Sequence, residues 1–183
     1  PDGGRPHTEA FLASLSRMFR AVFDHPRPTV AAVNGHAIAG GCVLALACDV
    51  RLMSGGRIGL AEVAVGVPFP TSALEIVRHA LGRDADRAIL RAETVGPEQA
   101  LATGMVQEVV AAEELLPRAM DLATELAARS PEAYRLAKTQ LHGPANAAME
   151  GTSAEDDAAV LEGWISEDTR RRIEAALEAL TRR

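Results

Sequence analysis

Apolar residues in the first half of the chain occur either at helical spacing or in short continuous runs. Phe11, Leu15, Phe19 and Phe23 recur every four residues, which predicts a helix that ends before two prolines at 26 and 28. Short β-branched and apolar runs between turn residues predict buried strands. The predicted strands are 29–33, 50–53, 57–60 and 105–110, and the predicted helices between them are 42–47, 71–80, 84–92 and 97–103.

From Glu113 onward the chain shows helical spacing only. Pro131 predicts the start of a new helix, and Gly143-Pro144 predicts a break in it. Strands alternating with helices, followed by helices alone, are typical of an α/β core with a helical appendage. The last two predicted helices are 154–165 and 169–180.

The boundary between these two parts is expected near residues 128–131. No low-complexity stretch marks a flexible spacer there, so the appendage should pack tightly. We therefore predict an α/β core over residues 1–128 and a helical region over residues 129–183.

Composition excludes several classes of function. Nineteen Lys and Arg against twenty-five Asp and Glu give the 183-residue chain a net charge of −6, whereas nucleic-acid binding depends on neutralising phosphates. No stretch reaches the roughly 18 to 20 apolar residues of a membrane-spanning helix. The chain starts with neither a signal peptide nor Met, which suggests that it begins after the true N-terminus. We expect a cytoplasmic protein that binds neither nucleic acid nor membrane.

A glycine-rich turn occupies residues 35–41, GHAIAGG, between a predicted strand and a predicted helix. Backbone N–H groups at such a helix start stabilise negative charge. A phosphate loop would need Lys and then Ser or Thr where Gly41 and Cys42 stand, and the GxGxxG pattern is absent. Two interpretations remain: an uncharged hole for an enolate or tetrahedral oxyanion, and a tight turn for close helix–strand packing.

Glu62 is the second candidate. From Ile58 through Leu74 it is the only ionisable side chain, and its neighbours are apolar. Apolar surroundings raise the pKa of a carboxyl group, as a general base or acid near neutral pH requires. The alternative is an exposed glutamate at a helix end. Because Glu62 and the glycine-rich turn follow neighbouring predicted strands, we expect them to share a pocket.

The remaining polar residues give weaker signals. The five histidines lack metal-ligand spacing, and Cys42 and Cys48 form no CxxC motif, so no metal site is predicted. Asp49 is expected to act as a cap or as a partner for Arg51. Trp164, like Phe69, is expected to be a core or interface anchor.

Four segments in register resemble the crotonase family, the enoyl-CoA hydratase/isomerase superfamily. The similarity covers the chain from about Thr29 to its end. The segments are PTVAAVNGHAIAGGC at 28–42, LALACDVR at 44–51, GLAE at 59–62 with VGVP at 65–68, and ALATGMV at 100–106.

This resemblance implies a fold and a binding mode. The fold would be an α/β spiral of ββα units, its N-terminal part absent here, with C-terminal helices that build a trimer or a dimer of trimers. Family members bind acyl-CoA thioesters and hold an enolate with two backbone N–H groups. One of these falls on Gly40, with Ala39 and Gly41 beside the substrate; the other belongs to an upstream segment, and no matching loop precedes Pro1. No metal or redox cofactor is implied, because coenzyme A enters as part of the substrate.

One departure from the family pattern concerns the acid–base residues. Hydratases of the family use two glutamates, of which the later matches Glu62 and the earlier falls on Val43. Hydration needs a base for water and an acid for the α-carbon, so a valine there argues against it. The segments 40–46, 59–62 and 164–168 look most like the Δ3,Δ2-enoyl-CoA isomerase branch.

We therefore predict an enoyl-CoA isomerase of fatty-acid β-oxidation. Glu62 would move a proton from C2 of a 3-enoyl-CoA to C4, while the Gly40 N–H holds the dienolate oxygen. Val43, Pro68 and Phe69 would line the acyl side and exclude water. Two alternatives remain open: hydration or another crotonase reaction on a CoA thioester, and a non-catalytic acyl-CoA-binding homologue.

Overall fold

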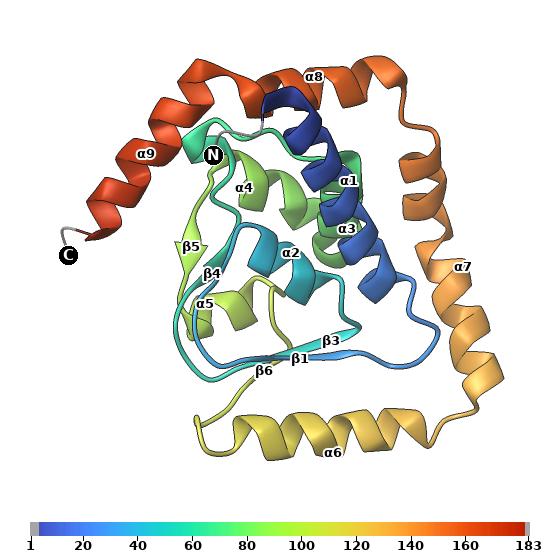
Figure 1. Ribbon diagram of the computed structural model, residues 1–183. Helices are drawn as coiled ribbons and strands as arrows, with labels where there is room; N and C mark the ends of the chain where they lie inside the picture. Colours follow the sequence, from blue (N-terminus) through green and yellow to red (C-terminus); the bar gives the residue numbers. More distant parts are fainter. Residues whose placement is uncertain (1–3, 182–183) are drawn as a thin grey trace.

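The computed structural model describes residues 4–181 (Figure 1). Within that range, short strands form two three-stranded sheets. In the first sheet all neighbours are parallel, whereas in the second β2 and β4 are parallel and β4 and β5 antiparallel. The first sheet has the order β1 (Val30–Val33), β3 (Val50–Met53), β6 (Glu108–Val109), and the second has the order β2 (Ala37–Ile38), β4 (Ile58–Gly59), β5 (Thr94–Val95).

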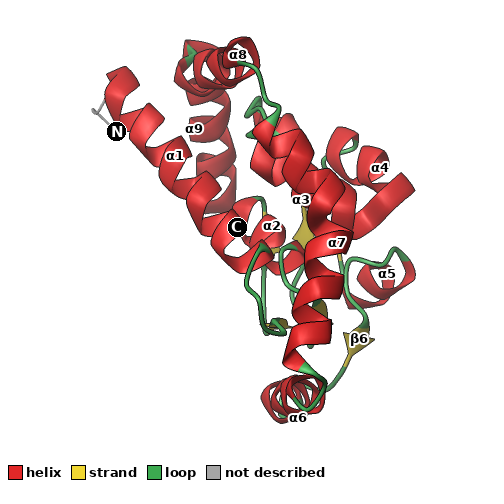
Figure 2. Ribbon diagram, turned by 90° about the vertical axis from the view of Figure 1, so that its right-hand side faces the viewer, coloured by secondary structure: helices red, strands yellow, loops and turns green. Residues whose placement is uncertain are grey.

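Helices surround these sheets. The first three are α1 (Gly4–Phe23), α2 (Gly40–Leu46) and α3 (Thr71–Leu81). The others are α4 (Ala85–Leu90), α5 (Pro97–Ala102), α6 (Leu115–Ala127), α7 (Pro131–Glu150), α8 (Ala154–Ile165) and α9 (Glu167–Thr181). The helices α6 to α9 follow one another around the core: α6 packs along the first sheet, α7 against α3, and α8 against α1 (Figures 1 and 2).

The core lies where α1, α2 and α3 meet the strands. Phe19 and Phe23 of α1 and Val43 of α2 are almost fully buried, as are Ile76 and Val77 of α3. Burial of each large apolar side chain contributes about 1.5–3 kcal/mol, so this cluster fixes how the three helices pack. The predicted α/β core followed by helices is confirmed, while the division at residue 128 stays a prediction.

Short strands were the weakest part of the sequence prediction. The strands at 29–33 and 50–53 are confirmed, but β6 covers only two residues of the predicted 105–110. Both β2, inside the predicted glycine-rich turn, and β5 were missed. Two-residue strands carry too little alternation to be recognised, because pairing with β4 rather than local pattern defines them.

The predicted break at Gly143-Pro144 is wrong. Helix α7 runs through Pro144, although a proline removes one backbone hydrogen bond and strains the helix by about 3 kcal/mol. Lys138, His142 and Ala145 form the buried face of α7, and this packing holds the helix together across the proline. The predicted start at Pro131 is confirmed, capped by the Ser130 side chain.

None of the helices within residues 4–181 is long and apolar enough to cross a membrane.

Candidate active site

A cavity of about 280 Å³, here called the Glu62 cavity, opens at the N-terminal ends of α2 and α3. It is bounded by α1 on one side and by α8 and α9 on another. Among the described residues, Glu62 is the only ionisable one in its wall. The lining residues are Phe11, Leu15, Phe19, Ala39, Gly40, Val43, Ala61, Glu62, Val65, Val67, Pro68, Phe69, Pro70, Ala73, Trp164 and Ile173.

Glu62 stands three residues after the end of β4 and immediately precedes a short 3₁₀ turn, Val63–Val65. Its side chain is half-buried rather than exposed, and Oε2 is buried without a hydrogen-bond partner among the described residues. Burial raises the pKa of this carboxyl group, and only the backbone amides of Glu62 and Ala61 oppose the shift. A carboxyl group in this setting is suited to take and return a proton near neutral pH.

The backbone at the start of α2 is strained. Ala39 has φ 55° and ψ −126°, a conformation that costs a non-glycine residue of the order of 1–3 kcal/mol. The β2–β4 pairing holds it there, since the Ala39 N–H donates to the Gly59 carbonyl at 2.9 Å. The Cys42 and Val43 N–H groups donate back to the Ala39 carbonyl at 2.8 and 3.1 Å.

The two glycines that open α2 are not required by packing. A Cβ on Gly40 would meet only the Phe19 ring at 3.6 Å, and one on Gly41 would meet nothing within 4 Å. Packing alone therefore does not explain the glycines, which weakens the interpretation as a tight-packing turn. Gly40 lines the Glu62 cavity with Ala39, whereas Gly41 does not.

Val43 stands one helical turn into α2 and is almost fully buried in the wall of the Glu62 cavity. Beside it, burial raises the pKa of the Cys42 thiol to about 12, with a smaller contribution from the nearby Glu62 carboxylate. This thiol stays protonated and unreactive. The first turn of α2 thus contributes backbone and the apolar Val43 side chain to the cavity wall, but no acid or nucleophile.

The loop after Glu62 is fastened to the C-terminal helices of the same chain. The Trp164 Nε1–H donates to the Pro68 carbonyl at 2.9 Å, and the Thr169 hydroxyl donates to the Gly66 carbonyl at 2.8 Å. Gly66 has φ 74°, a conformation that favours glycine, and a Cβ on Gly163 would lie 2.5 Å from the Pro68 ring.

Trp164 and Ile173 are cavity residues that the sequence did not assign to the site. Trp164 was predicted to be a core or interface anchor; its ring packs against Phe11 with centroids 5.6 Å apart and forms part of the cavity wall. It lies 96 residues from Pro68 in sequence. No local pattern could have indicated this contact.

Fold and cavity together define an α/β protein of crotonase-like architecture. A sequence model described as enoyl-CoA hydratase/isomerase matches residues 3–181, and the chain belongs to this family. The structure of human mitochondrial Δ3-Δ2-enoyl-CoA isomerase is similar in fold over 99% of this chain and 72% of that one, with a TM-score of 0.91 and 23% identity.

Relatives with higher sequence identity include proteins named as hydratases. The chain is 36% identical over 171 residues to a putative enoyl-CoA hydratase of Thermus thermophilus, covering 90% of this chain and 66% of the relative. A probable enoyl-CoA hydratase of Mycobacterium tuberculosis is 29% identical, with a TM-score of 0.78 over 89% of this chain and 69% of that structure. This chain spans just under two thirds of the length of the Thermus relative.

Proposed function

We propose that this protein acts on acyl-CoA thioesters and moves the double bond of a 3-enoyl-CoA to the 2-position. The observation that carries the proposal is the charge content of the Glu62 cavity: one carboxyl group, with Val43 in the wall where hydratases of the family carry a second glutamate. Proton transfer between two carbons needs one group that accepts and then returns a proton. Hydration must also activate a water molecule, and this needs a second group of that kind.

In the proposed reaction the Glu62 carboxylate removes a proton from C2 of the substrate. The electrons move into a dienolate, whose oxygen accepts a hydrogen bond from the Gly40 N–H. The protonated Glu62 then delivers the proton to C4, which leaves the double bond between C2 and C3. A second donor to the dienolate oxygen is expected from the segment that precedes residue 1 in the family.

The apolar walls support both steps. Pro68, Phe69 and Val43 keep water from the dienolate, and they remove from Glu62 the solvation that would make its carboxylate a weak base. Ala39 and Gly40 bring backbone to the cavity at the N-terminal end of a helix, which favours developing negative charge. Gly41 is proposed to contribute through this helix end rather than through the cavity wall.

Hydration of a 2-enoyl-CoA is the second candidate, favoured by the names of the curated relatives. Two substrates separate the reactions: 3-hexenoyl-CoA, followed by absorbance of the conjugated product, and crotonyl-CoA, followed by loss of its double bond. The protein should be prepared with any residues that precede Pro1 in its coding sequence. Conversion of the first substrate without hydration of the second supports the isomerase; the reverse pattern overturns it in favour of the hydratase. Binding without either reaction identifies a non-catalytic acyl-CoA-binding protein.

We also propose a homotrimer or a dimer of trimers. Leu116 and Met120, one turn apart on α6, are 64% and 59% exposed, and Leu136 on α7 is 50% exposed. Neighbouring exposed apolar side chains, such as Leu116 and Met120, mark subunit interfaces more often than single ones do. Because the relatives include bacterial enzymes such as that of Thermus thermophilus, we propose a cytoplasmic location.

A further inference from the structure

A second cavity, of about 350 Å³, lies at the C-terminal ends of α2 and α3, where α7 packs against them. The Glu62 cavity is lined by Gly40 and Val43 from the start of α2, whereas the second cavity is lined by Leu46 and Ala47 from its end. The proposed reaction does not use the second cavity.

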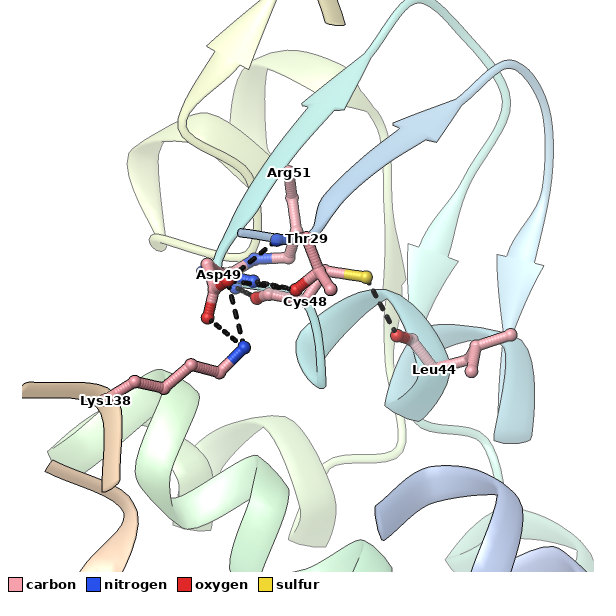
Figure 3. Close-up of polar contacts among 6 residues, drawn as sticks. All are labelled: Thr29, Leu44, Cys48, Asp49, Arg51 and Lys138. Carbon is pink, nitrogen blue, oxygen red and sulfur yellow. Dashed lines mark hydrogen bonds and ion pairs between the residues drawn. The ribbon is translucent and has the colours of Figure 1, made fainter. Parts of the chain in front are cut away.

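Buried charges line this cavity. Lys138 is 7% exposed, and its Nζ lies 2.8 Å from Asp49 Oδ1 and 3.0 Å from Oδ2. Asp49 Oδ2 also accepts hydrogen bonds from the Thr29 N–H at 2.8 Å and the Thr29 hydroxyl at 3.1 Å (Figure 3). Asp49 was expected to act as a cap or as a partner for Arg51. Its ion-pair partner is instead Lys138, 89 residues away, so the second of these alternatives is wrong.

Arg51 is 5% exposed and has no carboxylate partner among the described residues. Its Nε–H donates to the Met105 carbonyl and its Nη1–H to the Cys48 carbonyl, each at 2.8 Å. A guanidinium has five N–H donors, so donors remain for another acceptor. Lys138 and Arg51 are both positive and Asp49 is negative, so together these three residues give the wall of the second cavity a net positive charge. The chain as a whole has a net charge of −6.

His142 adds an unused polar atom to the same wall. The residue is 7% exposed, and its Nδ1 is buried without a hydrogen-bond partner among the described residues. Its ring stacks on Phe23 at 3.8 Å and lies 4.5 Å from the ring of His79. A buried polar atom without a partner destabilises the fold, and a bound ligand or water can satisfy it.

Leu46, Ala47, Ala80, Ala137 and Leu141 make most of the remaining wall apolar, and Tyr134, whose hydroxyl bonds to Asp49, adds one more polar group. We propose that the second cavity binds a small monocarboxylate with a short apolar tail, its carboxylate beside Lys138 and Arg51. One negative charge neutralises the excess positive charge, and the tail covers the apolar wall. A volume of about 350 Å³ is at the lower limit of ligand pockets, so an intact acyl-CoA is too large.

The test is calorimetric titration of the full chain with hexanoate, and with hexylamine as a probe of equal tail and opposite charge. We expect saturable hexanoate binding and none of hexylamine. Ala137→Leu fills the cavity from an exposed position on α7 and should weaken hexanoate binding about tenfold. Ala133→Leu, one turn earlier on the same helix and also exposed, lies outside the cavity wall and should bind as the unaltered protein does.

Lys138→Met tests the charge and should also weaken binding about tenfold, with folding checked by circular dichroism. Since this change leaves Asp49 unpaired, Ala137→Leu keeps the test decisive if the Met variant does not fold. Hexanoate binding that survives Ala137→Leu would place the ligand elsewhere, the Glu62 cavity included, and would overturn the proposal. Equal binding of hexylamine, or no saturable binding of hexanoate, would overturn it as well.

Discussion

The Glu62 cavity and the second cavity lie at opposite ends of the same helix pair, α2 and α3, and handle charge in opposite ways. In the Glu62 cavity a single carboxyl group stands among apolar side chains, and burial raises its pKa. In the second cavity Lys138 and Asp49 neutralise each other at 2.8 Å. An unpaired buried group is poised to change its protonation state, whereas a paired one is locked in it.

The direction of the helices fits this difference. The N-terminal end of α2, with its free N–H groups, faces the Glu62 cavity, where negative charge would develop on the substrate. Just past the C-terminal end of α2, the Cys48 carbonyl accepts a hydrogen bond from the Arg51 guanidinium. The start of the helix thus favours negative charge on the substrate, whereas its end helps to hold the Arg51 guanidinium, the cation beside which the proposed carboxylate would bind.

The largest effect is expected from Glu62→Gln, which keeps the shape of the side chain but removes the base. Turnover of 3-hexenoyl-CoA should fall by about 10²–10⁴-fold, while thioester binding persists. Steady-state kinetics with calorimetric binding measures both. Glu98→Gln, an exposed change on α5, serves as the control and should leave turnover unchanged. Substantial residual isomerase activity in the Glu62 variant would refute its role as the base.

Acid should lower the free energy of unfolding through His142, which lies in the wall of the second cavity. Burial, with the charges of His79 and Lys138, lowers the pKa of His142 to about 4, opposed by Asp49 and Asp24. Because an unfolded chain protonates histidine near pH 6.5, stability conferred by neutral His142 is lost as the pH falls from about 6.5 to 4, by at most about 3 kcal/mol.

Urea unfolding at pH 7 and pH 5 measures this loss. His142→Phe, which preserves the stacking on Phe23, should reduce the difference in unfolding free energy between the two pH values. His25→Phe, at an exposed position, is the control and should retain the difference. An unchanged difference in the His142 variant would show that other groups cause the acid sensitivity.

Gly163→Ala should disturb the wall of the Glu62 cavity. Its Cβ would lie 2.5 Å from the Pro68 ring, so α8 must move or the loop after Glu62 must shift. Overpacking of this kind costs about 1–3 kcal/mol and should lower kcat/KM as well. The matched change Gly143→Ala places a Cβ in open space on α7 and should be neutral or stabilising. Thermal unfolding and kinetics compare the pair; equal effects would contradict the contact.

The smallest effect is expected from Thr169→Val, which keeps the shape of the side chain. The change removes the hydrogen bond to the Gly66 carbonyl at 2.8 Å and the one that the Ser166 hydroxyl donates at 2.9 Å. The loss should be about 1 kcal/mol in unfolding free energy, with a modest fall in kcat. Thr124→Val, where an exposed threonine donates to the Met120 carbonyl on α6, is the control and should affect stability less and turnover not at all. An unchanged kcat in the Thr169 variant would show that the contact between Thr169 and the loop after Glu62 is not needed for catalysis.

Much of the Glu62 cavity could be predicted from local sequence. The apolar neighbours of Glu62 and the glycine-rich turn stand within 30 residues of each other, each within a few residues of the end of a strand. The pair Gly143-Pro144 led to the wrong prediction of a helix break. Helix propensity is low for proline, but it takes no account of the burial of His142 and Ala145, which stabilises α7 across the proline.

By itself, the sequence determined the alternation of strands and helices, the uncharged start of α2, and the apolar surroundings of Glu62. These features depend on residues that are close along the chain, so the pattern of residue types is enough to predict them. Only the tertiary structure decided that Trp164 and Thr169 close on the loop after Glu62, and that Lys138 neutralises Asp49. Such contacts join residues 89 to 103 positions apart, and they form because the packing of whole helices brings those side chains together.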